Sequence, residues 1–363
     1  MGKRVNTAVW LEKQGRWQVK VQKDNERRTF TSSAQGRTGQ REANAKADAW
    51  LDDGIEGTNT RIQDLYKEFI ETKQASTGQS NYLGIMSRYE NYISPAIGYK
   101  KISAITEQDL QNIINSAYSK KKLAAKTLQN IRGDLTSFLK FCRHKRITTL
   151  TPEELTIPAG AAKSQKQILQ PADLAKLFNS SRSLYHGKEI DEPYIGAYRL
   201  EVLTGLRPGE IIGLRWSNIF NNKIHVQGAI NAYGEATSGK NDNAIRTITL
   251  SPLAMQVLEY QRTYNDSADT VFDISSTHNY RRRWRKYCEY NDLTAVTPYE
   301  LRHTFVSVAK VLPDGQVKSI VGHSKNMDTF GIYGHTVDGE DLQTSLQIDA
   351  IFKTLLKPTS LVP

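Results

Sequence analysis

The chain has 363 residues, with 49 Lys or Arg against 38 Asp or Glu, so its formal net charge at pH 7 is +11. This length predicts two to three domains, and the basic balance favours a polyanionic partner, most simply nucleic acid. Hydrophobic residues make up 38% and charged residues 24% of the chain, a globular composition that excludes a disordered basic tail. A basic but otherwise ordinary enzyme is the alternative.

No apolar run approaches the roughly 18 residues that a membrane span needs, and the first residues lack the apolar stretch of a signal peptide. Cys142 and Cys288 are the only cysteines, which excludes a disulfide framework and a four-cysteine zinc site. We therefore expect no membrane partner and a reducing, cytoplasmic compartment.

Residues 1–57 are expected to form a small β-rich unit followed by a helix. Apolar and polar residues alternate over 15–21, a second strand begins at 27–30, and helical spacing covers 41–53. Up to residue 46 there are eleven Lys or Arg against four acids. This basic balance favours DNA over a catalytic pocket, and a solvated surface sheet is the alternative. The candidate DNA-binding residues here are Arg16, Lys20, Arg27 and Arg28.

Residues 60–150 are expected to be helical. Apolar spacing predicts helices over 63–72 and 82–93, a third that opens at 106, and a fourth over 128–142. Basic residues flank the fourth helix at both ends, which favours a grip on DNA phosphates over a merely solvated face. The candidates are Lys120, Lys121, Lys122 and Lys126 before it and Arg143 and Lys145 at its end.

A Pro- and Gly-containing linker is expected over 151–165, followed by a larger mixed domain over 165–363. Two strands, 223–227 and 246–250, should flank a long hairpin loop among helices. A last helix is expected over 340–356. Its apolar residues are Leu342, Leu346, Ile351 and Leu355.

The segment 204–214, TGLRPGEIIGL, places Arg207 at a helix start after a glycine turn. Glu210 follows one helical turn later, where its carboxylate can orient the guanidinium. A fixed arginine fork suits bidentate phosphate binding. Alone this pattern is weak, because Arg–Glu pairs on helices are common.

A second arginine, Arg302, lies in the segment 299–305, YELRHTF, between Tyr299 and His303. Two further motifs follow, VGHS with His323 and IYGH with Tyr333 and His335. Three histidines thus fall within 33 residues, whereas the acids of a divalent-metal cluster are missing. We expect no metal site and no cofactor.

Together these motifs resemble the two signature boxes of the tyrosine recombinases of the phage integrase family. The order of elements most resembles integrases of conjugative transposons and of phages of low-GC Gram-positive bacteria. The resemblance implies a multidomain α+β fold. It comprises a three-stranded arm-type DNA-binding domain (1–57), a helical, SAM-like core-binding domain (60–150) and a mainly α catalytic domain with a small antiparallel sheet (165–363).

The resemblance also implies a role for each matched residue. Tyr333 corresponds to the nucleophile that attacks the scissile phosphate, and Arg207 and Arg302 to the pair that holds its oxygens. His323 corresponds to a phosphate contact, Lys240 to the lysine that protonates the leaving 5′ oxygen, and Glu210 to the acid that supports the first arginine. These roles agree with the charge that develops when a phosphodiester is attacked.

Three further residues lie near the matched positions without an assigned catalytic step. Family members usually carry His where Tyr299 stands, so we expect a phosphate contact there and no proton abstraction near neutral pH. His303 is expected to support Arg302, and His335 to support the tyrosine-bearing loop. The spacing from His323 to Tyr333 is one residue longer than the commonest family spacing.

The function implied is site-specific recombination through a 3′-phosphotyrosyl intermediate and a Holliday junction, which integrates and excises a conjugative transposon or prophage on the bacterial nucleoid. The implied partners are core and arm-type DNA sites, a homotetramer that exchanges its C-terminal helices, an excision factor and a host DNA-bending protein. Docking of the C-terminal helix on its own domain is the alternative to this exchange. The alternatives are a type IB topoisomerase-like relaxing enzyme, a chromosome-dimer-resolving recombinase, a non-enzymatic DNA-binding regulator and a metal-dependent nuclease.

Overall fold

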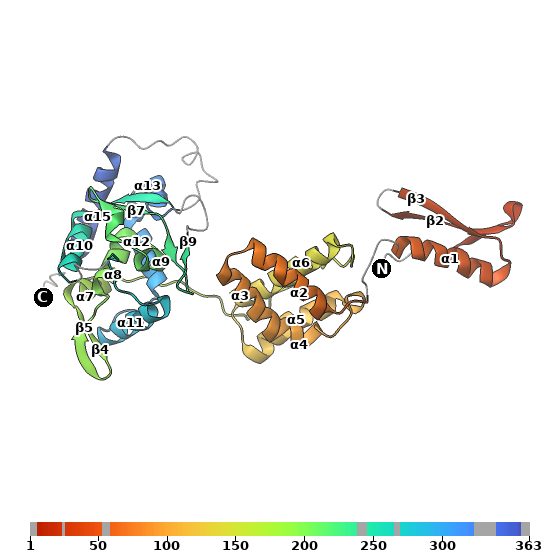
Figure 1. Ribbon diagram of the computed structural model, residues 1–363, viewed down its shortest axis with the longest axis horizontal. Helices are drawn as coiled ribbons and strands as arrows, with labels where there is room; N and C mark the ends of the chain where they lie inside the picture. The colour runs from red at the N-terminus through yellow and green to blue at the C-terminus, as the bar shows by residue number, and fades with distance from the viewer. Residues whose placement is uncertain are drawn as a thin grey trace. The chain divides into compact units, whose positions relative to one another are not determined.

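The computed structural model of the chain describes residues 6–23, 26–52, 59–237, 245–264, 269–322 and 339–356 (Figure 1). It divides into two compact units, Met1–Ser164 and Gln165–Pro363. The buried hydrophobic residues form separate clusters in the N-terminal sheet, in the helices that follow it and in the second unit. The division into three domains at the boundaries expected above stays a prediction.

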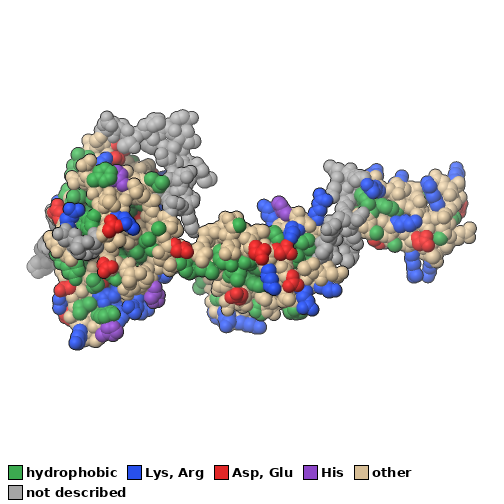
Figure 2. Space-filling model, viewed as in Figure 1, with side chains coloured by type: hydrophobic (Ala, Val, Ile, Leu, Met, Phe, Trp, Pro, Cys, Tyr) green, Lys and Arg blue, Asp and Glu red, His purple; other side chains and the backbone are tan. Residues whose placement is uncertain are grey.

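The N-terminal part is the three-stranded antiparallel sheet expected from the sequence, in the order β1-β2-β3. The strands are β1 (Val9–Leu11), β2 (Arg16–Lys23) and β3 (Glu26–Ser32), and α1 (Gly36–Asp52) packs on them. Val19 and Val21 are buried with Ala43 and Ala47 of the helix, since alternate strand residues share a face. Figure 2 shows Lys and Arg side chains over this small unit.

Helix α1 begins five residues before the predicted helix over 41–53. The first turn carries no apolar stripe that could have indicated it. Instead Gly39 lets the helix approach the sheet closely, because a Cβ there would lie 1.8 Å from the Ala34 carbonyl oxygen and 2.7 Å from the Trp17 ring. Because glycine has no side chain, the hydrophobic pattern of the sequence could not predict this contact.

The helical part of the first unit consists of α2 (Ile62–Ser76), α3 (Gln79–Arg88), α4 (Ser94–Ile97), α5 (Glu107–Lys121) and α6 (Ala125–His144). The predicted opening of the third helix at Thr106 is confirmed, since Thr106 and Asp109 form a reciprocal capping box. The apolar stripe predicted for the fourth helix is buried throughout.

The helix predicted over 82–93 is confirmed, with a π-helical turn inside it. Helix α3 ends at Arg88, the π-helical turn covers Tyr89–Ile93, and α4 follows without a break in the helical backbone. Pro95 lacks the N–H of a regular α-helical hydrogen bond, which is consistent with the changed hydrogen bonding near this point. Within the turn, the Tyr89 ring stacks on Tyr66 with centroids 3.8 Å apart.

The second unit is mainly helical with small antiparallel sheets. Its helices are α7 (Pro171–Asn179), α8 (Ile195–Thr204), α9 (Pro208–Ile212), α10 (Pro252–Tyr264), α11 (Thr277–Tyr290), α12 (Pro298–Val308), α13 (Asp314–Val321) and α15 (Glu340–Leu356). Its strands are β4 (Arg182–Tyr185), β5 (Lys188–Asp191), β6 (Ile219–Phe220), β7 (Lys223–Val226), β8 (Ala229–Ile230), β9 (Ala236–Thr237) and β10 (Arg246–Thr249). The predicted pairing of the strands at 223 and 246 is confirmed, because β10 pairs antiparallel with β7.

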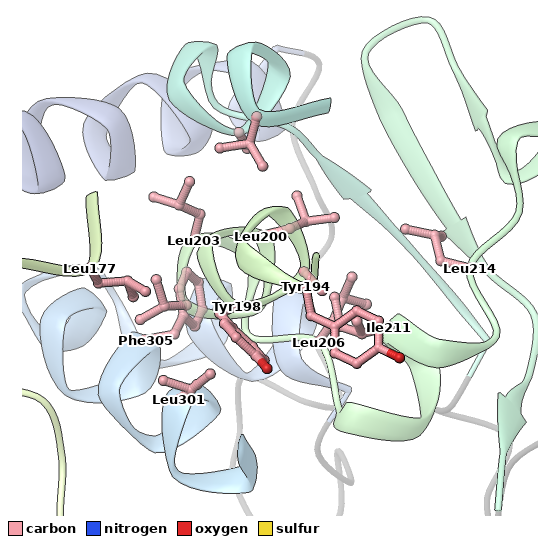
Figure 3. Packing of buried hydrophobic residues seen from close by; sticks show 14 of the residues in the cluster. Leu177, Tyr194, Tyr198, Leu200, Leu203, Leu206, Ile211, Leu214, Leu301 and Phe305 are labelled. Carbon is pink, nitrogen blue, oxygen red and sulfur yellow. The ribbon is translucent and has the colours of Figure 1, made fainter. Parts of the chain in front are cut away.

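Helix α8 forms the centre of the second unit and is buried on almost every side. Figure 3 shows side chains of α7, α9 and α12 that pack with those of α8, among them Leu177, Ile211 and Phe305 around Leu203. Because α8, α9 and α12 share this core, the two arginine-bearing segments predicted at 207 and 302 are held against one another.

Helix α15 has the predicted bounds. Of its predicted apolar residues, Ile351 and Leu355 pack against the core of the second unit, and the other two do not. Leu342 and Leu346 are 58% and 49% exposed, whereas Ile348 and Phe352 are buried against the core of the same chain. The Asp349 carboxylate accepts a hydrogen bond from the Leu253 N–H in the first turn of α10 (2.8 Å). This contact satisfies an unpaired N–H at a helix start and selects the docked face.

Candidate active site

Arg207 stands in a sharp turn between α8 and α9. Gly205 ends α8 in the left-handed conformation (φ +65°), and a Cβ there would lie 2.5 Å from the Phe305 ring. Pro208 then begins α9 at a position where its missing N–H costs nothing. The Glu210 carboxylate accepts hydrogen bonds from the Arg207 backbone N–H (2.8 Å) and from its Nη1 (2.7 Å). The predicted Arg207–Glu210 pair is therefore present.

Arg302 lies on α12 and is only 2% exposed. Its Nη1 donates to the carbonyl oxygen of Gly205 (2.6 Å) and its Nη2 to that of Val321 (2.5 Å). These bonds connect Arg302 to the turn that carries Arg207 and to the end of α13. The structure thus brings the two predicted arginines to one place although 95 positions separate them in the sequence.

A third guanidinium, which no sequence motif predicted, belongs to this cluster. Arg246 of β10 donates from Nη1 and Nη2 to the two Glu210 oxygens (3.0 and 2.8 Å). Strand β10 places Arg246 on the same side as the buried Ile248. An arginine at an inward position of an alternating strand is the signal that could have identified it. We call Arg207, Arg246, Arg302 and Glu210 the arginine cluster.

The charges of the arginine cluster are unbalanced. Burial raises the pKa of the Glu210 carboxyl, but hydrogen bonds from Arg246 and Arg207 outweigh burial and hold the pKa below its ordinary value. Burial, together with the positive charges of Arg207 and Arg246, lowers the pKa of Arg302 to about 10. Three guanidiniums around one carboxylate create a site that favours an anion, and the Arg207 side chain, 32% exposed, can reach it.

Tyr299 and His303 lie one helical turn apart on α12. The Tyr299 side chain is 43% exposed, and the two rings meet edge to face with centroids 5.3 Å apart. His303 therefore contacts Tyr299. Lys240, His323, Tyr333 and His335 lie outside the described residues.

The linker into the second unit is bound to α12. The Glu300 carboxylate accepts hydrogen bonds from the backbone N–H groups of Gln167 (3.2 Å) and Thr297 (2.6 Å), and the Thr304 hydroxyl accepts one from Leu169 (3.0 Å). These anchors lie two residues before and after Arg302 on the helix, so the linker helps to fix the position of that arginine.

Basic residues of the N-terminal sheet lie on both of its faces. Arg16, Lys20 and Arg27 are exposed on the face opposite α1, because their positions alternate with the buried Val19 and Val21. Arg28 lies on the α1 side, with its guanidinium 5.3 Å from the centre of the Trp50 ring. The face away from α1 is the one available to a polyanion.

The two ends of α6 differ. Lys120, Lys121 and Lys122 end α5 and Lys126 begins α6, and all four side chains are exposed. At the other end, Arg143 donates to the Leu150 carbonyl oxygen (2.8 Å) and Lys145 forms an ion pair with Glu68. The end with the four lysines is therefore the stronger candidate for phosphate contacts.

The described part of the chain contains neither a metal-binding cluster nor a membrane-spanning helix. No group of three or more His, Cys, Asp or Glu there is arranged to hold a metal ion. None of the helices described is both long enough and apolar enough to cross a membrane.

The fold and the arginine cluster define a mainly helical domain with a site that favours an anion. Residues 167–340 match the phage integrase family, and residues 62–118 match the SAM-like N-terminal domain of phage integrases. The chain belongs to the phage integrase family of tyrosine recombinases, a class of DNA breaking and rejoining enzymes.

Similar proteins agree with this assignment. A XerC-like tyrosine recombinase of Caldanaerobacter subterraneus is 23% identical over 93% of this chain and 96% of its own length. The ICEBs1 integrase of Bacillus subtilis is 21% identical over 62% of this chain and 66% of its own length. The Tn1549 transposon integrase, solved with transposon right end DNA, has a TM-score of 0.62 at 18% identity and covers 78% of this chain and 98% of its own. A lambda integrase tetramer bound to a Holliday junction has a TM-score of 0.57 at 15% identity, covering 93% and 99%.

Proposed function

We propose that this chain is a site-specific integrase that cleaves DNA with Tyr333 and rejoins it through a 3′-phosphotyrosyl intermediate. The observation that carries the proposal is the arginine cluster. Glu210 binds Arg207 and Arg246, and Arg302 donates to the Gly205 carbonyl in the turn that carries Arg207. The segment that bears His323 and Tyr333 follows α13 directly in the sequence, and the carbonyl of Val321 at the end of that helix accepts a hydrogen bond from Arg302.

The proposed reaction exchanges one phosphodiester for another. The Tyr333 oxygen attacks phosphorus and gives its proton to water, the bond to the 5′ oxygen breaks, and Lys240 donates a proton to that oxygen. Arg207 and Arg302 stabilise the charge on the non-bridging oxygens, with His323 as a further contact. Attack by another strand's 5′ hydroxyl reverses the step. Because the covalent link conserves the energy of the broken bond, the cycle needs no nucleotide cofactor and no metal.

Tyr299, His303 and His335 have supporting roles in this proposal. The exposed Tyr299 hydroxyl donates a hydrogen bond to a phosphate oxygen, since a phenol is a poor base near neutral pH. His303 orients the Tyr299 ring that it contacts edge to face. His335 supports the loop around Tyr333.

Two basic surfaces would hold the DNA. The lysines at the start of α6 contact core-site phosphates, and the exposed face of the N-terminal sheet binds a second, arm-type site. The separate basic sheet favours integration and excision of a phage or conjugative transposon over simple relaxation of DNA. Complexes of the Tn1549 integrase with transposon right end DNA and of the lambda integrase with a Holliday junction support this choice.

The lambda integrase tetramer on a Holliday junction supports a homotetramer on DNA for this chain. Exchange of C-terminal helices between its protomers is a further part of the proposal. In the single chain α15 packs on its own unit, against α7, α10 and β10. An excision factor and a host DNA-bending protein are proposed as accessory partners.

A nicked core-site duplex, in which the released strand diffuses away, tests the proposal by trapping a covalent adduct. The wild-type chain should form the adduct in the presence of EDTA, and Tyr333→Phe should bind the duplex but form none. An adduct that persists in Tyr333→Phe would contradict the assigned nucleophile, and loss of cleavage in EDTA would favour a metal-dependent nuclease.

A deletion of residues 1–57 tests the arm-site assignment. The shortened chain should bind the core site as before and lose affinity for a distal second site. Loss of core-site binding would contradict the proposed domain roles.

A further inference from the structure

Arg246 and Glu210 form a buried pair beside the half-buried Arg207. The side chains of Arg246 and Glu210 are 6% and 4% exposed, and both terminal nitrogens of Arg246 donate to the carboxylate. The Arg207 side chain binds the same carboxylate through Nη1 alone and is 32% exposed. The buried guanidinium thus compensates the charge of Glu210, which leaves the positive charge of Arg207 available to an anion.

Arg246 also contacts the end of α13. Three consecutive carbonyl oxygens there each accept a hydrogen bond from a different arginine. Ile320 accepts from Arg246 Nε (2.6 Å), Val321 from Arg302 Nη2 (2.5 Å) and Gly322 from Arg207 Nη2 (3.3 Å). The last carbonyls of a helix lack intrahelical partners and carry partial negative charge, so they are suited to bind cations.

This arrangement connects the phosphate-binding arginines to the chain that leads to the nucleophile. Gly322 ends α13 in the left-handed conformation (φ +65°), and His323 is the next residue in the sequence. A change in the position of Arg246 would therefore disturb both Arg207, through Glu210, and the residue from which the tyrosine-bearing segment starts.

We propose that Arg246 is a positioning residue for DNA cleavage, which holds Glu210 and the end of α13 in register so that Arg207 and the nucleophile act on the same phosphate. This inference rests on the proposed function. Arg246 is buried and is not assigned a contact with DNA. Its contribution is the orientation and residual charge of Arg207.

The test is Arg246→Gln, which removes the charge and the fork while keeping a polar side chain. With saturating nicked core-site duplex, we expect the rate of adduct formation to fall about 100-fold, the loss typical of a misplaced oxyanion-stabilising group. DNA affinity should change little. Arg246→Lys keeps the charge but not the fork, so its rate should be intermediate.

The matched control is Arg283→Gln, because Arg283 also forms a buried two-point pair with a glutamate, Glu192, and contacts no member of the arginine cluster in the bonds described. It should cleave at nearly the wild-type rate at a temperature where both variants are folded. Equal losses in the two variants would overturn the inference, since both would then reflect damage to the fold alone.

A pH profile supplies a readout that a structural role would not change. Without Arg246 the pKa of Glu210 should rise, so Glu210 becomes protonated on mild acidification and releases Arg207. Cleavage by Arg246→Gln should therefore fall more steeply with decreasing pH than cleavage by the wild type. If Arg246→Gln fails to fold, the pH profile of Arg246→Lys is compared with that of the wild type instead.

The outcomes separate the two proposals. A wild-type adduct with unimpaired Arg246→Gln and Arg246→Lys cleavage would overturn the inference and leave the proposed function standing. A wild-type chain that forms no tyrosine adduct would overturn the proposed function, and this inference with it.

Discussion

Two buried sites in the second unit each combine arginine with glutamate, but they differ in the balance of their charges. Glu192 and Arg283 form a one-to-one pair, with side chains 0% and 5% exposed. Glu210 instead serves two arginines, Arg246 and Arg207, and Arg207 reaches the surface. The first site is closed and balanced, whereas the second carries excess positive charge toward solvent.

The pKa values of the two glutamates record this difference. Burial raises the pKa of Glu192 and its bond to Arg283 does not cancel that effect, whereas two arginines hold the pKa of Glu210 below its ordinary value despite burial. A balanced buried pair contributes packing and specificity, but an unbalanced one can bind a phosphate. The number of arginines around one carboxylate therefore distinguishes the closed pair from the site that is proposed to bind phosphate.

The largest expected effect is at Arg207. Arg207→Lys should lower the rate of adduct formation about 10²- to 10³-fold, because one ammonium cannot replace a fork that binds both Glu210 and a phosphate oxygen. Arg283→Lys is the comparison and should cleave normally. Rates are measured on the nicked duplex at saturating enzyme. A normal rate in Arg207→Lys would contradict the proposed role of the Arg207 guanidinium in cleavage.

The next effect falls on stability. Arg283→Gln should destabilise the second unit by about 3 kcal/mol, since Glu192 is left buried without its charged partner. Calorimetric unfolding of the full chain measures this loss. An unchanged transition would mean that the closed pair contributes nothing to the fold.

A smaller effect is expected at Glu210. Glu210→Gln should slow adduct formation about tenfold, because the amide keeps one acceptor for Arg207 but loses the charge that orients it. Glu192→Gln should leave the rate unchanged. Equal rates in the two variants would show that the number of arginines around the carboxylate has no consequence for cleavage.

The smallest effect is the dependence of stability on pH. Glu210 has a lowered pKa in the folded chain, so its contribution is present above the unfolded pKa and is lost as pH falls through the folded value. Glu192 has a raised pKa, so its contribution is present at low pH and is lost as pH rises through the folded value. Relative to wild type, the pH dependence of the melting temperature in the acidic range should therefore change in opposite directions in Glu210→Gln and Glu192→Gln. Changes in the same direction would contradict the opposite pKa shifts of the two carboxyls.

Much of the fold follows from local patterns. Alternation over 15–21 predicts β2, the apolar stripe predicts α6, and the Thr106 capping box marks the start of α5. Patterns fail where the decisive contact is distant. The start of α1 depends on Gly39 against the sheet, and α15 docks through Asp349 and Phe352 instead of Leu342 and Leu346.

The sequence by itself determined the order of the motifs and the Arg207–Glu210 pair, because residues three apart at a helix start are neighbours whatever else the chain does. Only the tertiary structure decided that Arg246, 36 positions from Glu210, completes the cluster and that three arginines bind successive carbonyls of α13. Spacing sets contacts within a helical turn, but contacts between elements depend on how α8, α9, α12 and β10 pack around one core.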